Sequence, residues 1–522
     1  MSLSLSLPQS GENLKLNTDI RPKQVKSWLE NLPLANIMEA AHSVSEALTS
    51  LNRMPIKDHL RLELLELYFP AIDNLVQELQ PKYTLAALPM PEKSRQAANL
   101  SRTLYTELAY GYKVLLVERL GKRLSLRGTH LHLIIQRTLA ALSKLLCVFY
   151  NTYSPTPAGI WSEIHQLAHM ALQRNLHDEL VDGGKQSISS TYKQILLLAL
   201  ANPYKLMQGE VGRVNDYLAT HSKQAKLYPL QPVQGNFGLF LIDLESDSPP
   251  KSADQEGDID PRTHILIGTD TLVTSLHDLT TKLESGRSPK QLNLPDYAKE
   301  AVYLNLLRRL LKDWVTVPRR KFKRIANSDT MEVCVGLRAT FHFLSLTESE
   351  VQTLDFSDNR AAEFAAVKNT AIQFSISPWS VTNESASGLR LKRIAGSNVQ
   401  IRVGDVIGMC PPGTLKLSIA VVRWVTNDET ENFEVGVQML APSATAVTLK
   451  PVVSGPRDIF RAALLLPEIR PLQQPASIIA SPATFRTKLE YLLYENGVVS
   501  NVRAMRLIEQ TASFDQFQYS VE

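Results

Sequence analysis

The first half of the chain carries apolar residues at the three- and four-residue spacing of amphipathic helices. This spacing recurs from residue 23 to residue 226, for example at Leu104, Leu108 and Leu115. Prolines and glycines interrupt it at intervals that fit the ends of helices. The pattern therefore predicts an all-helical domain over residues 20–228, with about eight helices.

Residues 229–316 have a mixed pattern. Apolar runs at 237–244 and 264–267 predict strands, and residues 269–284 and 295–314 predict helices. Residues 243–260 contain seven acidic residues and two adjacent prolines, a composition that predicts an exposed loop because it buries too little apolar surface. This region is predicted to be a short mixed α/β connector.

From residue 331 onward the period shifts to two, which is the pattern of half-buried strands. The strands are predicted at residues 332–335, 338–343, 371–376, 389–393, 406–409, 415–424, 433–439, 462–466, 477–479, 484–493 and 503–509. Short turns between them predict a small antiparallel β-barrel over residues 317–442. An acidic, alanine-rich segment at 347–368 predicts an inserted helix or loop. Residues 443–522 are a β-rich extension that either enlarges the barrel or forms a second sheet, so the fold class is α+β and multidomain.

Composition narrows the class of protein. A net charge of +4 on 522 residues does not favour nucleic-acid binding through the whole surface. Cys147, Cys334 and Cys410 form no CxxC pair, which predicts neither a zinc site nor a disulfide scaffold and fits a reducing compartment. The uninterrupted apolar runs are shorter than the roughly 20 residues of a membrane span. We expect a cytoplasmic protein.

A dense basic cluster lies between the connector and the barrel. Residues 308–324 contain eight basic residues and one acidic residue, a local charge of +7, and end in VPRRKFKR. Such a cluster repels itself unless solvent screens it or an anion neutralises it. A solvated hinge is one interpretation, and a phosphate- or base-binding arm is another, because a guanidinium can bind either bidentately.

A second motif, NESASG at residues 383–388, precedes a predicted strand. Asn383 and Ser385 are two residues apart, so on an extended segment both side chains point to one face and can hydrogen-bond a planar polar ligand. Gly388 permits tight backbone geometry or close approach of a ligand. A simple turn is the alternative interpretation.

Together the two motifs resemble the PilZ family of bacterial receptors for cyclic dimeric GMP (cyclic-di-GMP). RKFKR at residues 320–324 is similar to the family's RxxxR motif, and NESASG is similar to its (D/N)xSxxG motif. VGDV at 403–406, VVRW at 421–424 and FEVGV at 433–437 resemble the family's later strands. The resemblance covers residues 318–440. It departs from the family in the long gap between the motifs, for which the 347–368 insertion accounts, and in Asn at position 383 where Asp is commoner.

The resemblance implies a ligand, a site and a fold. Arg320 and Arg324 would bind the phosphates and guanine edges of cyclic-di-GMP, while Asn383 and Ser385 would bind the other side of a guanine and Gly388 would keep the surface open. Arg319 could help to hold a second ligand molecule. Ligand binding would order the arginine arm and reorient the helical domain, which we expect to be the output module that binds a protein partner.

No other motif predicts chemistry. His165 and His169 have the i, i+4 spacing of a helical metal pair but lack the HExxH glutamate, and no catalytic or nucleotide-hydrolysing motif is present, so we predict no enzyme, metal or cofactor. Two rival functions remain open. One is a nucleic-acid-binding protein that uses the 308–324 arm, for which salt dependence would be steep. The other is a scaffold protein whose barrel binds no ligand.

Overall fold

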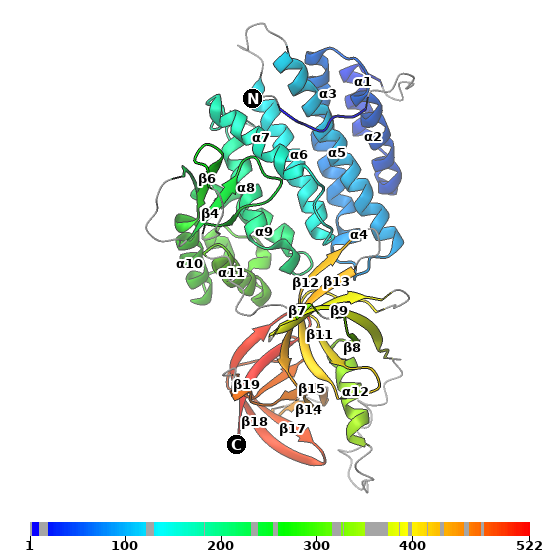
Figure 1. Cartoon of the computed structure of the whole chain (residues 1–522), viewed down its shortest axis with the longest axis vertical. Helices are drawn as coiled ribbons and strands as arrows, with labels where there is room; N and C mark the ends of the chain where they lie inside the picture. The colour runs from blue at the N-terminus through cyan, green and yellow to red at the C-terminus, as the bar shows by residue number, and fades with distance from the viewer. Residues whose placement is uncertain are drawn as a thin grey trace. The chain divides into compact units, whose positions relative to one another are not determined.

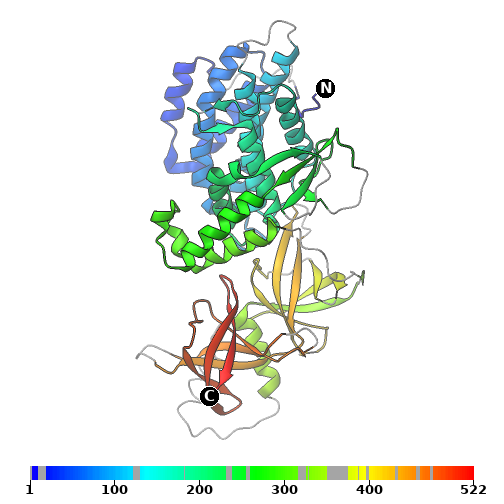
Figure 2. The ribbon, with the colours of Figure 1, turned by 90° about the vertical axis from the view of Figure 1, so that its left-hand side faces the viewer.

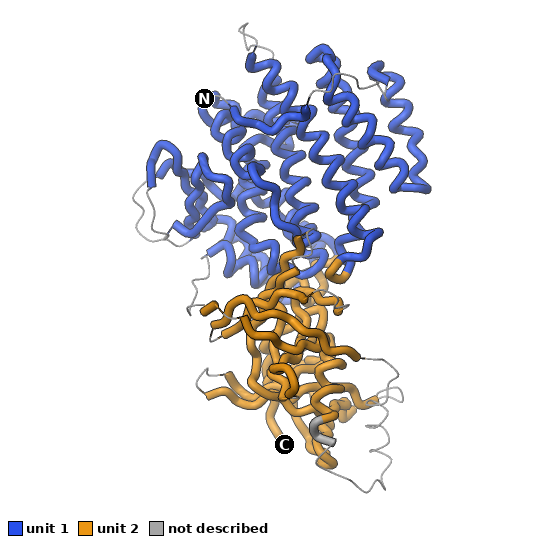
Figure 3. Tube along the Cα trace, turned by 45° about the vertical axis from the view of Figure 1, so that its right-hand side comes forward, with its two compact units in different colours: residues 1–86, 90–296, 306–318 blue, residues 87–89, 297–305, 319–522 orange. Residues whose placement is uncertain are grey.

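The computed structural model divides into two compact units (Figure 3). Unit 1 comprises Met1–Ala86, Met90–Asp296 and Leu306–Pro318, and unit 2 comprises Ala87–Pro89, Tyr297–Asn305 and Arg319–Glu522. The structure describes residues 3–9, 19–121, 130–181, 183–230, 238–253, 259–315, 325–326, 328–349, 374–385, 387–394, 399–414, 416–428, 433–453, 459–470 and 474–522.

Unit 1 is mainly helical, which confirms the predicted helical region (Figure 1). Its helices are α1 (Pro22–Glu30), α2 (Ile37–Asn52), α3 (Asp58–Leu79), α4 (Pro81–Thr84), α5 (Glu92–Gly121), α6 (Leu131–Asn151), α7 (Ile160–Gln173), α8 (Ile188–Leu200) and α9 (Glu210–His221). The apolar spacing becomes a buried stripe, as in α5, where Leu104, Leu108 and Leu115 are buried. Helix α6 is long and apolar enough to cross a membrane, the one such helix found in the described part of the chain. However, 72% of its most apolar window is buried inside the protein, as in the core helix of a bundle.

The predicted mixed connector contains a small antiparallel sheet (Figure 2). The strand order is β3 (Lys226–Pro229), β6 (His264–Gly268), β4 (Leu239–Asp243) and β5 (Lys251–Ser252). Helix α10 (Asp270–Glu284) follows β6, and α11 (Ala301–Asp313) precedes the basic arm. Trp314, directly after α11, is fully buried and its indole N–H donates to the Leu197 carbonyl at 3.0 Å.

The acidic stretch in this connector is not simply an exposed loop, so that prediction was incomplete. The Asp247 carboxylate accepts hydrogen bonds from the backbone N–H groups of Gly159, Trp161 and Ser162 at 2.6 to 3.2 Å. These N–H groups lie at the start of α7 and have no partner within their own helix. Asp247 therefore caps a helix that lies far from it in the sequence, and composition alone carries no signal for that contact.

The first sheet of unit 2 forms a ring of antiparallel strands. Its order is β10 (Gly388–Arg393), β13 (Phe433–Ala441), β12 (Ser418–Asn427), β11 (Val406–Cys410), β8 (Thr330–Val335), β9 (Ser377–Ser385) and β7 (Ile325–Ala326), and β9 also pairs with β10. The β9–β10 pairing closes six of these strands into a ring, and β7 pairs with β9. This arrangement confirms the predicted antiparallel β-barrel.

The second sheet of unit 2 is a closed barrel of its own, which decides between the two arrangements left open for residues 443–522. The strand order is β14 (Thr445–Pro451), β15 (Arg461–Leu466), β16 (Ser477–Ala480), β19 (Asp515–Val521), β18 (Val498–Gln510) and β17 (Glu490–Glu495). Strands β14 and β19 were not predicted. Residues 484–489 lie outside β17, although the alternation had extended the predicted strand back to residue 484.

Two strand predictions near the first barrel were wrong. Residues 338–343 belong to helix α12 (Leu337–Ser349). Ala339, Phe341 and Phe343 fit a period of two, which led to the strand prediction. Leu337, Phe341 and Leu344 also fit a helical period. These last three are buried in a core cluster with strand residues of both barrels, including Ile419 and Leu464. Residues 374–376 are not strand, and β9 begins at Ser377. The predicted 347–368 insertion lies mostly outside the described residues.

Candidate ligand-binding site

The NESASG motif forms the end of β9 and the turn into β10. Across this hairpin, Asn383 is opposite Arg390 and Ser385 is opposite Gly388. The register shifts between Arg390 and Leu391, since Leu391 pairs with Val381 and leaves Thr382 as an extra residue. The motif is therefore a strand pair with a β-bulge next to its first residue.

The bulge determines the face that Asn383 occupies. Val381 and its partner Leu391 are both buried inside the barrel. Directly opposed residues share a face and successive residues of a strand point to opposite faces. The Arg390–Asn383 pair, which follows the buried Leu391–Val381 pair, therefore lies on the outer face. The Ser385–Gly388 pair lies two pairs further along the hairpin and therefore on the same face. The structure thus brings together Asn383 and Ser385 as the spacing predicted.

Asn383 and Ser385 differ in how they are engaged. Both are half-buried. The Ser385 hydroxyl donates to the carbonyl oxygen of Gly388 at 3.0 Å, which holds the turn. The Asn383 amide makes no side-chain hydrogen bond with the residues that the structure describes, so it retains its full capacity to donate and accept.

Gly388 has a packing role, which agrees with tight backbone geometry, one of the two roles that the sequence left open for it. A Cβ atom built at this position would lie 2.1 Å from the backbone oxygen of Val437 on β13, far inside van der Waals contact. The glycine therefore lets the β10 and β13 backbones approach closely. An open surface for a ligand remains a prediction, and the close backbone contact is sufficient by itself to require glycine.

The arginine motif is joined to this site by β7. Arg319, Arg320 and Arg324 lie outside the described residues. Ile325, which follows Arg324 in the sequence, pairs with Glu384, and Ala326 pairs with Asn383. Strand β8 pairs with the earlier part of β9, between Ser377 and Ser380. The residues that directly follow the arginine motif therefore pair with β9 at Asn383 and its neighbour Glu384.

Arg390 and Trp424 form a feature beside Asn383 that was not predicted. The Arg390 guanidinium pairs with the Glu434 carboxylate and lies 5.7 Å from the centre of the Trp424 ring. Trp424 is opposite Gly436, where a Cβ would overlap the indole, so the glycine lets the ring lie across β13. The sequence feature that could have indicated this contact is the pair of segments VVRW at residues 421–424 and VGV at residues 435–437. A glycine directly opposite a tryptophan leaves room for the indole ring.

Part of the predicted basic cluster is neutralised. Arg308 pairs with Glu284, with 2.7 Å between Nη2 and Oε1, and Arg309 pairs with the buried carboxylate of Glu210. Both pairs lie within unit 1. Neither guanidinium is an unpaired cation for a nucleic acid, which weakens the rival interpretation of residues 308–324 as one continuous arm.

The histidine pair has structural partners. His165 is buried and its ring nitrogens lie 2.8 Å from the Tyr192 hydroxyl and 2.9 Å from the Ser248 carbonyl oxygen. Burial lowers the pKa of His165, which favours the neutral ring. Within the described ranges, no group of three or more His, Cys, Asp or Glu residues could hold a metal ion.

Comparison with known proteins covers almost the whole chain. The family described as "Cyclic-di-GMP receptor FimW, N-terminal domain" matches residues 23–232, "Cyclic-di-GMP receptor FimW, middle PilZ domain" matches residues 239–375 and 347–446, and "FimW C-terminal beta-barrel domain" matches residues 446–521. The chain is 27% identical over 572 residues to the cyclic-di-GMP receptor FimW of Pseudomonas aeruginosa, an alignment that covers 99% of this chain and 93% of that protein. No solved structure matches.

The matches extend well beyond residues 318–440, where the resemblance was expected. They include the helical region and the second barrel, for which no motif had been found. The middle match covers β9 and β10 together with the rest of the first barrel. The chain belongs to the PilZ-domain family.

Proposed function

We propose that this protein is a receptor for cyclic-di-GMP that binds the ligand between the arginine arm and the outer face of the first barrel. The FimW relative is named as a receptor for this ligand. The observation that carries the proposal is the β7–β9 register, in which the residue after Arg324 pairs directly beside Asn383. The two motifs therefore supply complementary groups to one place.

The chemistry of the groups fits the ligand. Cyclic-di-GMP has two phosphates and two guanines, and the guanidinium groups of Arg320 and Arg324 suit phosphate oxygens and the O6/N7 edge of guanine. The Asn383 amide can donate and accept along another guanine edge, and the Ser385 hydroxyl retains acceptor lone pairs while it donates to Gly388. Arg319 would contact a second ligand molecule.

Isothermal titration calorimetry of the intact chain with cyclic-di-GMP tests the proposal. We expect micromolar or tighter binding that weakens at least about tenfold in Arg320→Ala, Arg324→Ala and Asn383→Ala, because each loses charge-assisted or paired hydrogen bonds. Matched controls are Arg461→Ala and Asn501→Ala, both on exposed positions of the second barrel. Absence of binding by the folded wild-type chain would refute the receptor function.

A backbone variant tests the register separately from the ligand contacts. Ile325 is 73% exposed and contributes little to the core. Ile325→Pro removes a strand N–H and disfavours the β7–β9 pairing, and we expect it to weaken binding about tenfold. Ile325→Ala keeps the backbone pairing and should bind like the wild type. If the proline variant bound cyclic-di-GMP as tightly as the wild type, the β7–β9 pairing would not be needed to position the arginine arm.

The output step is a further part of the proposal. The arm lies in the sequence between α11 and β7, so a ligand that binds it would change how the helical unit is held relative to the barrels. The helical unit would then bind a protein partner, in the cytoplasm where a second messenger acts, without catalysing a reaction. Small-angle scattering with and without cyclic-di-GMP tests this step. An unchanged profile at saturating ligand would refute it.

A further inference from the structure

A short segment at residues 3–9 lies against helices α5 and α7 of unit 1. The Ser4 N–H donates to Oε1 of Gln166 at 2.8 Å, and the Ser6 N–H donates to Oε1 of Glu163 at 2.5 Å. Leu3 and Leu5 are partly buried, whereas Ser4 and Ser6 are exposed. Alternating contacts of this kind are typical of an extended peptide. Gln166 and Glu163 are three residues apart on α7, so they present side chains to the same line of backbone.

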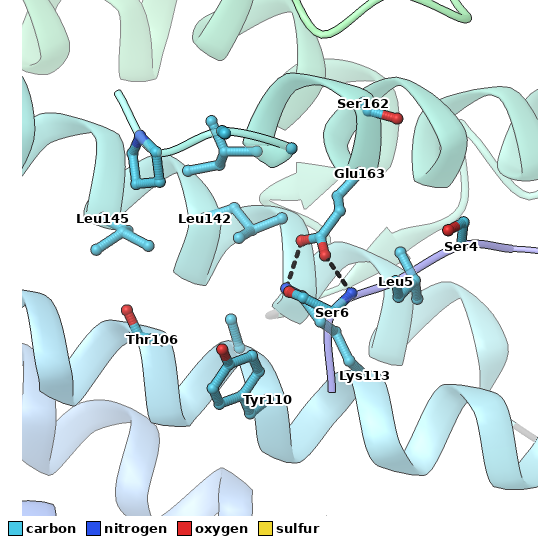
Figure 4. A pocket seen from close by; sticks show the side chains of 15 residues that line it. Ser4, Leu5, Ser6, Thr106, Tyr110, Lys113, Leu142, Leu145, Ser162 and Glu163 are labelled. Atoms are coloured by element: carbon cyan, nitrogen blue, oxygen red, sulfur yellow. Dashed lines mark hydrogen bonds and ion pairs between the residues drawn. The ribbon is translucent and has the colours of Figure 1, made fainter. Parts of the chain in front are cut away.

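A buried ion pair forms the floor of this contact (Figure 4). Lys113 of α5 and Glu163 of α7 are paired, and their side chains are only 3% and 7% exposed. Lys113 Nζ also donates to the Ser6 hydroxyl oxygen at 3.0 Å. The Glu163 carboxylate thus uses Oε2 for the lysine and Oε1 for the peptide backbone. An ion pair this buried adds little net stability compared with apolar packing, but it places a fixed acceptor for a backbone N–H.

The segment does not fill the space beside it. A cavity of about 550 Å³ remains, lined by the segment itself and by side chains of three helices and the turn before α7. Leu142, Leu145 and Ile160 give it apolar walls, while Tyr110 and Thr106 add hydroxyl groups. In Figure 4 the labelled Leu5 lies at one side of this space. A bulkier apolar side chain than Leu5 could therefore enter the cavity from the same backbone position.

We propose that the groove between α5 and α7 is a binding site for an extended peptide segment of a partner protein, and that residues 3–9 occupy it as a competing strap. Gln166 and Glu163 would read two backbone N–H groups spaced two residues apart. The residue between them would place an apolar side chain in the cavity. The charges of Lys113 and Glu163 cancel, so the site suits a neutral segment with small polar and apolar residues in alternation, which is the pattern of the strap itself.

Fluorescence anisotropy with labelled peptides tests this proposal on the full-length chain. The probes are Leu-Ser-Leu-Ser-Leu-Pro, which copies residues 3–8, and the same peptide with phenylalanine at its third position. Ser6→Pro removes the N–H that Glu163 accepts and is expected to release the strap, so that this variant binds the first peptide at least tenfold more tightly than the wild type. The phenylalanine peptide should bind more tightly still.

Two controls separate the site from general stickiness. A peptide N-methylated at its fourth residue lacks the donor for Glu163 and should not bind. Addition of Gln166→Ala to the Ser6→Pro chain should weaken binding about tenfold, whereas addition of Gln173→Ala, at the end of the same helix, should not. A chain that lacks residues 1–18 repeats the test if Ser6→Pro alters the fold. Equal binding by wild-type and released chains, or by the methylated peptide, would overturn the proposal, as would a released chain that only exchanges its strap with a second copy.

Discussion

Substitution of Gly388 distinguishes two reasons for the glycine in the NESASG motif. A Cβ in Gly388→Ala would lie 2.1 Å from the Val437 backbone oxygen and 3.3 Å from the Cα of Gln438. Backbone atoms of a paired strand cannot move aside as a flexible side chain can, so β10 and β13 must separate locally. Overpacking of this kind costs about 1–3 kcal/mol. We expect a loss of about 2 kcal/mol in the opening free energy of the β10–β13 pairing, with weaker ligand binding as a consequence.

Hydrogen exchange of the intact chain measures this loss locally. Amides in residues 388–393 and 433–441 should exchange roughly 30-fold faster in Gly388→Ala, since 1.4 kcal/mol corresponds to a factor of ten. Gly121→Ala is the matched control, because a Cβ there meets no atom within 4 Å. If Gly388→Ala abolished cyclic-di-GMP binding without faster exchange in β10 and β13, the glycine would serve the ligand and the packing argument would be refuted.

Three further substitutions test the fold. Asp247→Ala removes the acceptor at the start of α7 and should lower the free energy of unfolding, measured by urea titration, by about 1–2 kcal/mol. The control Asp278→Ala breaks an exposed pair with Lys282 and should change this free energy by under about 0.5 kcal/mol. Equal effects of the two substitutions would contradict the capping role of Asp247. Phe341→Ala should lower the free energy of unfolding by about 3–5 kcal/mol. Leu346→Ala, at a position that is 47% exposed, should leave this free energy almost unchanged in thermal unfolding. A larger loss in Leu346→Ala than in Phe341→Ala would contradict the way helix α12 packs. Burial raises the pKa of Asp313 from 3.8 to about 6, so the folded chain holds a proton that the unfolded chain releases, and the free energy of unfolding falls as the pH rises between about 4 and 6. Asp313→Asn should remove about 2 kcal/mol of that decline. If the free energy of unfolding of this variant fell between pH 4.5 and 7 as steeply as that of the wild type, the result would contradict the prediction.

The sequence predicted those elements whose burial follows one clear period. The leucines of α5 and the alternation of β11 to β13 became buried stripes and buried strands. The strand prediction for residues 338–343 was wrong because their apolar positions satisfy both periods, and tertiary packing against the strands of both barrels selects the helix. The loop prediction around Asp247 was incomplete for a different reason. A helix cap that comes from about 85 residues away in the sequence leaves no local pattern.

The sequence predicted which residues form the candidate site, a prediction that stays open, but it did not predict the strand geometry around Asn383 and Ser385. Asn383 and Ser385 were correctly predicted to share a face, because alternate residues of a strand do so. Which face they share depends on the bulge at Thr382, and a single extra residue exchanges the inner and outer faces of a strand. The contact between Arg390 and Trp424 likewise depends on the register between three strands, which no single segment specifies.

The long gap between the two motifs is compatible with one site because both of its ends are fixed on the same barrel. Strands β7 and β8 follow one another along one edge of β9, and β10 occupies the other edge. Helix α12 ends at Ser349 and β9 begins at Ser377, so the residues between them connect two elements that are already held in place. The entropy cost of closing a chain segment between two fixed ends rises only slowly with the length of the segment. An insertion there therefore increases the distance between the motifs in the sequence without changing the strand pairing that brings Ala326 and Asn383 together.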